Sequence, residues 1–337
     1  MKSLFTSLVL AAGLLLTLGN EVQAAVVSFG SGANQFNMEF VTIGNPGNAA
    51  DTTGSPNPAG KVDYVYGIGK YEVNADTIDK YNANFGSFNS LAITKIGQGN
   101  KPATGVSWNE AARFVNWLNA NTNNFVAYKF TTGGVNDNIA LWDPILDPLD
   151  YDSSNPYRSK RATFVLPSYN EWYKAAYYDP SKSGGGGYWI YPTGSNTAPT
   201  PVASGTQAGT AVYAKGLAHG WPGPADVDQA GGLSPYGVMG LSGNVFEWEE
   251  TSYSLTNHDG GLVRPYRGAY YGSFSEVSMA SSGRFLGGAP TAESFDIGFR
   301  VAMVTPSGGQ VPEPTSMAIF GLGALGMAYR ARRKAMA

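Results

Sequence analysis

The sequence predicts an α+β fold in which irregular backbone outweighs regular structure. Two segments begin with strong helix-start signals, at Ser107 and Ser168. Short strand-like stretches and long runs rich in Gly, Asn, Ser and Thr fill much of the remaining chain. With 337 residues, 43% of them hydrophobic, the chain is long enough for one large core or two modest ones.

The N-terminus has the composition of a secretory signal peptide. Lys2 is followed by an uncharged run from Ser3 to Asn20, and Val22-Gln23-Ala24 has the small-x-small pattern of a cleavage site. We therefore assign residues 1–24 to a signal peptide that is cleaved after Ala24. A buried N-terminal helix is the weaker alternative, because it explains neither the basic start nor the cleavage pattern.

The next segment predicts strands interrupted by turns. From Val26 to Tyr66 the pattern is strand-like, apart from a cluster of turn residues from Gly44 to Gly60 that indicates a surface loop. A metal loop is the weaker alternative for this cluster, because Asp51 is its only carboxylate. Apolar and polar residues alternate from Val62 to Val73, which predicts a further strand. Residues Ala75 to Phe85 resemble a short helix.

The clearest helix runs from Ser107 to Asn119. Ser107 is a good N-cap, and Glu110 stands three residues on, as in a capping box. A second helix is predicted from Ser168 through Tyr177, with Glu171 in the equivalent position. The residues of this helix that we expect to face the core are Trp172, Ala175 and Ala176.

Two long segments between these elements are predicted to be loops. Residues 121–161 contain many Asn and Asp, but they lack the regular ligand spacing of an EF-hand, so a solvated insertion is favoured over a calcium loop. From Ser181 to Gly232 the chain consists largely of turn residues.

The stretch from Ser234 to Trp248 is irregular but strongly apolar. Glycines and Asn244 interrupt any helical or strand period, whereas many of the other side chains are apolar. Such a loop should be buried, and its backbone N–H and C=O groups then need polar partners. A metal ion, or side chains such as Asn244 and Glu247, could supply them.

This stretch resembles the signature loop of the formylglycine-generating-enzyme domain, also called the sulfatase-modifying factor domain. The resemblance rests on Tyr236-Gly237 and on Leu241-Ser242-Gly243-Asn244-Val245-Phe246-Glu247-Trp248. Other pieces of the family pattern follow in family order: Tyr71-Glu72-Val73, Gly105-Val106-Ser107-Trp108, Ala111, Trp117-Leu118, Leu166-Pro167, Glu171-Trp172, Ala175-Ala176, Arg267-Gly268 and Gly298-Phe299-Arg300-Val301. The resemblance implies a single globular domain at residues 25–304 with the family's fold, a loop-rich variant of the C-type lectin fold.

The C-terminus combines a linker, an apolar run and a basic end. Residues 305–310 form a flexible linker, and the last segment, 311–337, begins with Val311. An uncharged run from Thr315 to Tyr329 precedes a basic cluster, which is typical of a membrane anchor, although the run is short for a permanent span. This tail resembles the PEP-CTERM sorting signal of bacteria. The resemblance implies transient membrane contact, processing by an exosortase-type enzyme near Pro312-Glu313-Pro314, and release to the cell surface or extracellular matrix.

The composition excludes several classes of function. Only 14% of the residues are charged and the formal net charge is −3, which argues against a nucleic-acid partner. The chain contains no cysteine, so neither disulfides nor thiolate chemistry are available to it. The enzyme that gives the family its name uses paired cysteines and copper. We therefore expect no copper site of that kind and no formylglycine generation by that mechanism.

Other catalytic arrangements have weak support. The sulfoxide synthases, a related branch, hold iron in a histidine-rich site, whereas this chain has only His219 and His258. His258-Asp259 lacks the nucleophile elbow of a hydrolase. A glycosidase pair would have to come from three clustered carboxylates whose spacing in space is unknown: Glu247, Glu249 and Glu250.

Calcium is the favoured cofactor. In the family, one structural calcium ion is bound by the signature loop, and the resemblance places its ligands at Gly240, Gly243, Val245 and Glu247. The two carbonyl positions and the carboxylate remain, but Gly240 lacks a side-chain oxygen, for which a water molecule could substitute. Alternatively, Glu247 accepts hydrogen bonds from backbone N–H groups of the loop. The sequence leaves both interpretations open.

Two functions remain after these exclusions. The favoured one is an exported, surface- or matrix-associated binding or structural module, with an extracellular polysaccharide or a surface protein as its partner. Aromatic residues make up 13% of the chain and could stack on sugar rings, although we expect most of them in the core. The alternative is a divergent metal-dependent oxidoreductase of the same superfamily.

Overall fold

The computed structural model describes residues 25–216 and 222–306. The predicted signal peptide with Ala24, the sorting motif Pro312-Glu313-Pro314 and His219 lie outside these described residues. In the described part, no helix has the length and apolarity that a membrane span requires.

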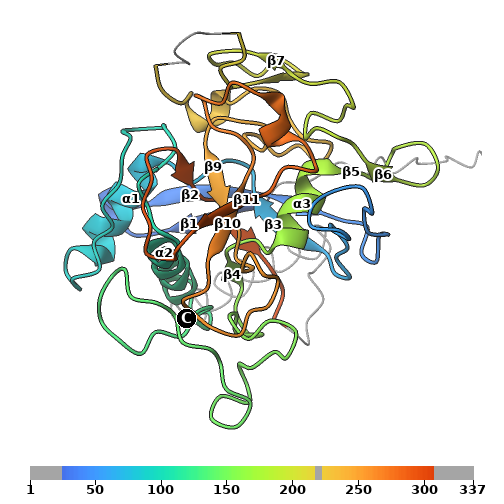
Figure 1. Cartoon of the computed structure of the whole chain (residues 1–337). Coiled ribbons are helices and arrows are strands. Elements are labelled where there is room, and N and C mark those ends of the chain that lie inside the picture. The colour runs from blue at the N-terminus through green and yellow to red at the C-terminus, as the bar shows by residue number, and fades with distance from the viewer. Residues whose placement is uncertain (1–24, 217–221, 307–337) are drawn as a thin grey trace, which may run out of the picture.

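A five-stranded sheet brings the two ends of the domain together (Figure 1). Its strand order is β1-β2-β3-β13-β4, and all its pairings are antiparallel. The strands are β1 (Ala25–Phe29), β2 (Phe36–Ile43), β3 (Tyr66–Gly69), β4 (Phe164–Val165) and β13 (Ala302–Met303). Because β13 lies between β3 and β4, the end of the domain is fixed inside this sheet.

A second sheet of four strands has the order β11-β10-β9-β12, in which β12 runs parallel to β9. These strands are β9 (Phe246–Trp248), β10 (Arg264–Arg267), β11 (Phe285–Gly288) and β12 (Ile297–Gly298). The described residues also form two short strand pairs: β5 (Tyr178–Asp179) with β6 (Gly187–Tyr188), and β7 (Thr200–Pro201) with β8 (Thr210–Ala211). The predicted irregular loop therefore ends in a central strand, β9.

Three α-helices flank the strands: α1 (Ala75–Tyr81), α2 (Trp108–Asn121) and α3 (Tyr169–Tyr177). Figure 1 shows α2 and α3 on opposite flanks of the sheets. Both predicted capping boxes are confirmed, because Ser107 and Ser168 each cap their helix and exchange hydrogen bonds with the Glu three residues on. Short helical turns occupy η1 (Gly32–Asn34), η2 (Asn82–Gly86), η3 (Val227–Gln229) and η4 (Glu276–Met279).

The strand predicted from Val62 to Val73 is shorter in the structure. Only Tyr66–Gly69 forms β3, and the chain then leaves the sheet. The backbone after β3 pairs elsewhere: Lys70 O accepts from Met239 N, and Val73 N donates to Phe299 O. This departure turns Glu72 toward the buried loop. The helix predicted over Ala75 to Phe85 likewise ends at Tyr81 and continues as η2.

The core confirms the predicted burial. Trp172, Ala175 and Ala176 of α3 are fully buried, as expected. The loop from Ser234 to Trp248 is also buried over most of its length, including Val238, Leu241, Val245 and Trp248. The chain is thus a loop-rich α+β domain whose core includes irregular backbone.

Candidate functional site

Asn244 connects the buried loop to its surroundings. It adopts a left-handed backbone conformation with φ 70°, which Asn tolerates better than most residues. Its side-chain Oδ1 accepts from Ala225 N at 2.8 Å, and its Nδ2 donates to Glu72 Oε1 at 3.1 Å. Its carbonyl accepts from Tyr271 N at 2.8 Å. The Asn244 side chain therefore binds groups outside the loop, and not the backbone groups of the loop itself as the sequence suggested.

Glu247 has side-chain partners rather than the backbone N–H donors that one interpretation expected. The Arg300 guanidinium donates to both oxygens of its carboxylate. Trp172 Nε1 donates to the same carboxylate at 2.7 Å. Glu247 and Arg300 are both buried, with at most 1% of either residue exposed. Two further Arg300 N–H groups donate to the carbonyls of Gly69 and Met239.

Glu72 is a second buried carboxyl beside this ion pair. Its Oε2 has no hydrogen-bond partner among the described residues. Burial raises the pKa of Glu72 to about 7, the Arg300 guanidinium opposes that shift, and the Glu247 carboxylate adds to it. Gly240 packs directly against this carboxyl, since a Cβ at Gly240 would lie 2.5 Å from Glu72 Oε1. Gly240 is therefore a glycine for two reasons, this contact and its φ of 84°.

The predicted calcium ligands lie in one loop, but Glu247 is already paired with a cation. An ion at Gly240, Gly243, Val245 and Glu247 would have to share the carboxylate with Arg300. Glu72 Oε2 is the buried oxygen near Gly240 that has acceptor capacity to spare. In the described part of the chain, no group of three or more His, Cys, Asp or Glu side chains is arranged to hold a metal. Calcium at this loop stays a prediction.

The other clustered carboxylates are also bound by arginines. Glu249 pairs with Arg267 and Arg284, and Glu250 pairs with Arg158. Both carboxylates are fully buried. Since each is held by a guanidinium inside the domain, they are structural groups and not a glycosidase pair facing a cleft.

His258-Asp259 lies in an exposed turn. His258 Nδ1 is 2.9 Å from Thr256 Oγ1, and Asp259 Oδ1 accepts from Gly261 N. The two side chains therefore bond to different atoms of their own turn, which is the usual role of such residues in loops.

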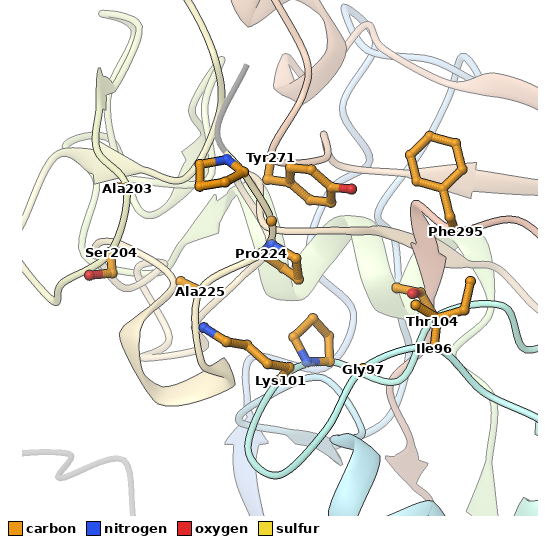
Figure 2. A pocket seen from close by; sticks show the side chains of 13 residues that line it. Ile96, Gly97, Lys101, Thr104, Ala203, Ser204, Pro224, Ala225, Tyr271 and Phe295 are labelled. Carbon is orange, nitrogen blue, oxygen red and sulfur yellow. The ribbon is translucent and has the colours of Figure 1, made fainter. Parts of the chain in front are cut away.

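A cavity with a volume of about 470 Å³ lies beside Asn244 (Figure 2). Its wall contains small and apolar residues, two aromatic rings and three polar side chains. The lining residues are Ile96, Gly97, Lys101, Pro102, Thr104, Ala203, Ser204, Pro222, Gly223, Pro224, Ala225, Tyr271 and Phe295. Figure 2 shows Tyr271 and Phe295 on one side and Lys101 and Thr104 on the other. None of these lining residues carries a carboxylate. We call this space the lateral pocket.

Asn244 positions two walls of the lateral pocket. Ala225 and Tyr271 both line it, and both donate their backbone N–H to Asn244. A third wall is fixed by Lys101, whose Nζ lies 3.0 Å from Asp226 Oδ1. Sequence reasoning missed this pocket because its residues come from separate segments with no spacing in common. Sequence reasoning also missed the arginines that pair with the buried glutamates, although Arg267 and Arg300 belong to the quoted family motifs.

A smaller cavity of about 240 Å³ lies between β2, the residues after β3 and η3. Its lining includes Glu39, Glu72 and Asp228. Two of these are bound: Glu39 pairs with Lys70 at 2.9 Å, and Asp228 accepts from Asn100. The carboxylates of this cavity therefore already have partners inside the domain, apart from the Oε2 atom of Glu72.

Two family models match the chain. The sulfatase-modifying factor enzyme 1-like domain matches residues 35–305, and the PEP-CTERM protein-sorting motif matches residues 310–334. Both resemblances predicted from the motifs are confirmed.

Comparison with solved structures shows the same fold. Treponema denticola variable protein 1 is similar over 83% of this chain and 98% of its own, with 22% identity and a TM-score of 0.53. CarF is similar over 84% of this chain and 99% of its own, with 20% identity and a TM-score of 0.50. No curated protein matches the chain. The relation to C-type lectins stays a prediction.

Replacing Arg300 with Met should destabilise the domain strongly. The change leaves Glu247 and Glu72 buried without a cation, and breaking a buried pair in this way costs about 3–5 kcal/mol. Chemical denaturation followed by tryptophan fluorescence measures the loss. If the Met variant fails to fold, the stability of Arg300→Lys is measured in its place, because Lys keeps the positive charge but loses the two-pronged contact with the Glu247 carboxylate.

The matched control is Lys80→Met, which breaks the half-exposed Lys80–Asp76 pair and should cost less than about 1 kcal/mol. Equal losses of unfolding free energy in the two variants would mean that the buried pair contributes no more to stability than the half-exposed pair.

Glu72 should make the stability of the domain fall as the pH rises. Its folded pKa of about 7 lies above the ordinary 4.5, so between these values the native state holds a proton that the unfolded state has released. Relative to Glu72→Gln, the native chain should lose up to roughly 3 kcal/mol between about pH 4.5 and 7. Urea denaturation across this range measures the difference. Parallel curves for the two proteins would refute the shift.

Proposed function

The chain belongs to the sulfatase-modifying factor enzyme 1-like domain family, and we propose that it is a binding module of the bacterial surface with no cysteine-based oxidase activity. Its PEP-CTERM motif implies an exported, cell-surface-directed protein that an exosortase-type enzyme recognises. Signal-peptide cleavage after Ala24 and release into the matrix are further parts of the proposal.

The absence of cysteine carries the proposal. The family's named activity transfers oxidising equivalents through paired thiolates, and a chain without cysteine has no such nucleophile or copper ligand. The carboxylates that could replace them in other chemistry are buried and paired with arginines: Glu247, Glu249 and Glu250. A preformed cavity on a rigid core, by contrast, is what a binding module requires.

The lateral pocket is the proposed binding site. Tyr271 and Phe295 offer ring faces, while Lys101 and Thr104 offer hydrogen-bond donors. A ligand with a flat or apolar face and an acceptor group suits this wall. Such a ligand is expected on the polymers of the cell surface, either an extracellular polysaccharide or a surface protein.

Ala203→Trp should weaken surface binding because the indole would fill the pocket. Ala203 lines the pocket and is exposed, so the domain should still fold. Labelled tail-processed protein is titrated onto washed cells of the producing bacterium, and the apparent Kd should rise by about tenfold or more. Val26→Trp is the control, since Val26 is 63% exposed on β1 and does not line the pocket.

Protease and periodate treatment of the cells separate protein from polysaccharide ligands. Unchanged binding of the Ala203 variant would exclude this pocket.

Metal analysis tests calcium and the oxidoreductase alternative together. If the loop binds calcium as proposed, protein purified without chelator should contain about one calcium per chain, and chelator should lower its melting temperature. Glu247→Gln should abolish this response, whereas Glu276→Gln, which changes a carboxylate in a partly exposed ion pair, should retain it. No calcium and no chelator effect would exclude the site. Stoichiometric iron or copper would overturn the binding-module proposal in favour of the oxidoreductase.

A further inference from the structure

The insertion between α2 and β4 carries a group of exposed apolar side chains. Ile145, Leu146 and Leu149 are 84%, 78% and 65% exposed, and Phe125 and Val126 are also exposed. We call these five residues the insertion patch. Apolar residues scattered singly over a surface need no explanation, but a cluster of large ones marks an interaction site.

Side-chain hydrogen bonds fix the turn that carries part of the patch. Asp143 Oδ1 accepts from Ile145 N at 2.7 Å and from Leu146 N at 2.8 Å. Asp147 accepts from Asp143 N and from Lys129 Nζ. These hydrogen bonds fix the backbone of the turn on which Ile145 and Leu146 are exposed.

The two halves of the patch are joined through one arginine. Arg161 forms a two-pronged pair with Asp150, the residue after Leu149, at 2.7 and 3.0 Å. The same guanidinium lies 3.7 Å from the centre of the Phe125 ring. Phe125 and Asp150 therefore contact the same guanidinium, which brings the chain next to Leu149 close to Phe125.

Arg161, at the Phe125 edge of the patch, lies close in sequence to the point where the chain leaves the domain. Val304 N donates to Thr163 O at 2.7 Å, only two residues beyond Arg161. The described chain ends at Pro306. The uncharged run that begins at Thr315 starts nine residues later, so it can lie at most about 30 Å from this exit.

We propose that the insertion patch contacts the lipid bilayer while the uncharged run of residues 315–329 is inserted in it. The inference rests on the proposed tail anchoring, because the short connection would hold this side of the domain against the membrane. Lys129 and Arg161 neutralise Asp147 and Asp150 at the patch. The contact should therefore depend on apolar insertion and be insensitive to salt and to lipid charge.

The proposed orientation leaves the lateral pocket accessible. In Figure 1 the green loops between α2 and β4 project at the bottom of the view, whereas β7, which precedes the pocket residues Ala203 and Ser204, lies at the top. A membrane at the insertion patch would thus face the side of the domain away from β7.

A single fluorophore tests the contact, because the chain has no cysteine of its own. Leu146→Cys is labelled with an environment-sensitive dye in the full-length chain and reconstituted into phosphatidylcholine vesicles. We expect a blue-shifted emission that nitroxide-bearing lipids quench, unchanged by high salt or by added anionic lipid. Phe88→Cys is the matched control: Phe88 is 81% exposed in the segment after η2, and its label should stay in water. Melting curves confirm that both variants fold.

The outcomes separate the inference from its premise. If the chain floats with vesicles but the label at position 146 stays in water, the patch contact is wrong and tail anchoring stands. If the full chain does not float, tail anchoring fails and the inference fails with it. A label that is already shielded without vesicles would overturn the bilayer contact, because the uncharged run of the tail or a second copy of the chain would then cover the patch. The mass of the protein in solution distinguishes a monomer covered by its own tail from a dimer.

Discussion

The buried ion pair between Glu247 and Arg300 is the interaction on which the rest of the domain depends. The carboxylate belongs to β9, and the guanidinium follows β12. Its other N–H groups bind the carbonyls of Gly69, at the end of β3, and Met239 in the buried loop. One side chain thereby joins both sheets to irregular backbone. Burying two charges is costly, and the pair persists because each guanidinium nitrogen finds an acceptor in this one arrangement.

Buried carboxylates paired with arginines also occur in the residues that follow the loop. Glu249 and Glu250 are buried as well, and arginines from β10 and from the insertion before β4 neutralise them. These pairs connect segments distant in sequence, as disulfides do in many exported proteins. A domain without cysteine can hold irregular backbone in its core by this means, since charged hydrogen bonds satisfy carbonyls that no sheet reaches.

Local signals made part of this architecture predictable. The caps at Ser107 and Ser168 act within one helical turn, so their residues suffice to locate α2 and α3. Burial of the loop followed from its apolar content. The strand predicted through Val73 was too long because its backbone pairs with Phe299, far away in sequence. The arginine partners and the lateral pocket depend on such distant contacts throughout, and no spacing in the sequence encodes them.

Asn244 is the link between this buried framework and any function at the lateral pocket. Its carbonyl and side-chain oxygen hold the backbones of Tyr271 and Ala225, and its amide nitrogen reaches Glu72 beside Arg300. The pocket wall is therefore attached directly to the charged centre of the domain. The contacts that shape the pocket wall are made by an asparagine carbonyl and side-chain amide, so the shape of the pocket needs no thiolate.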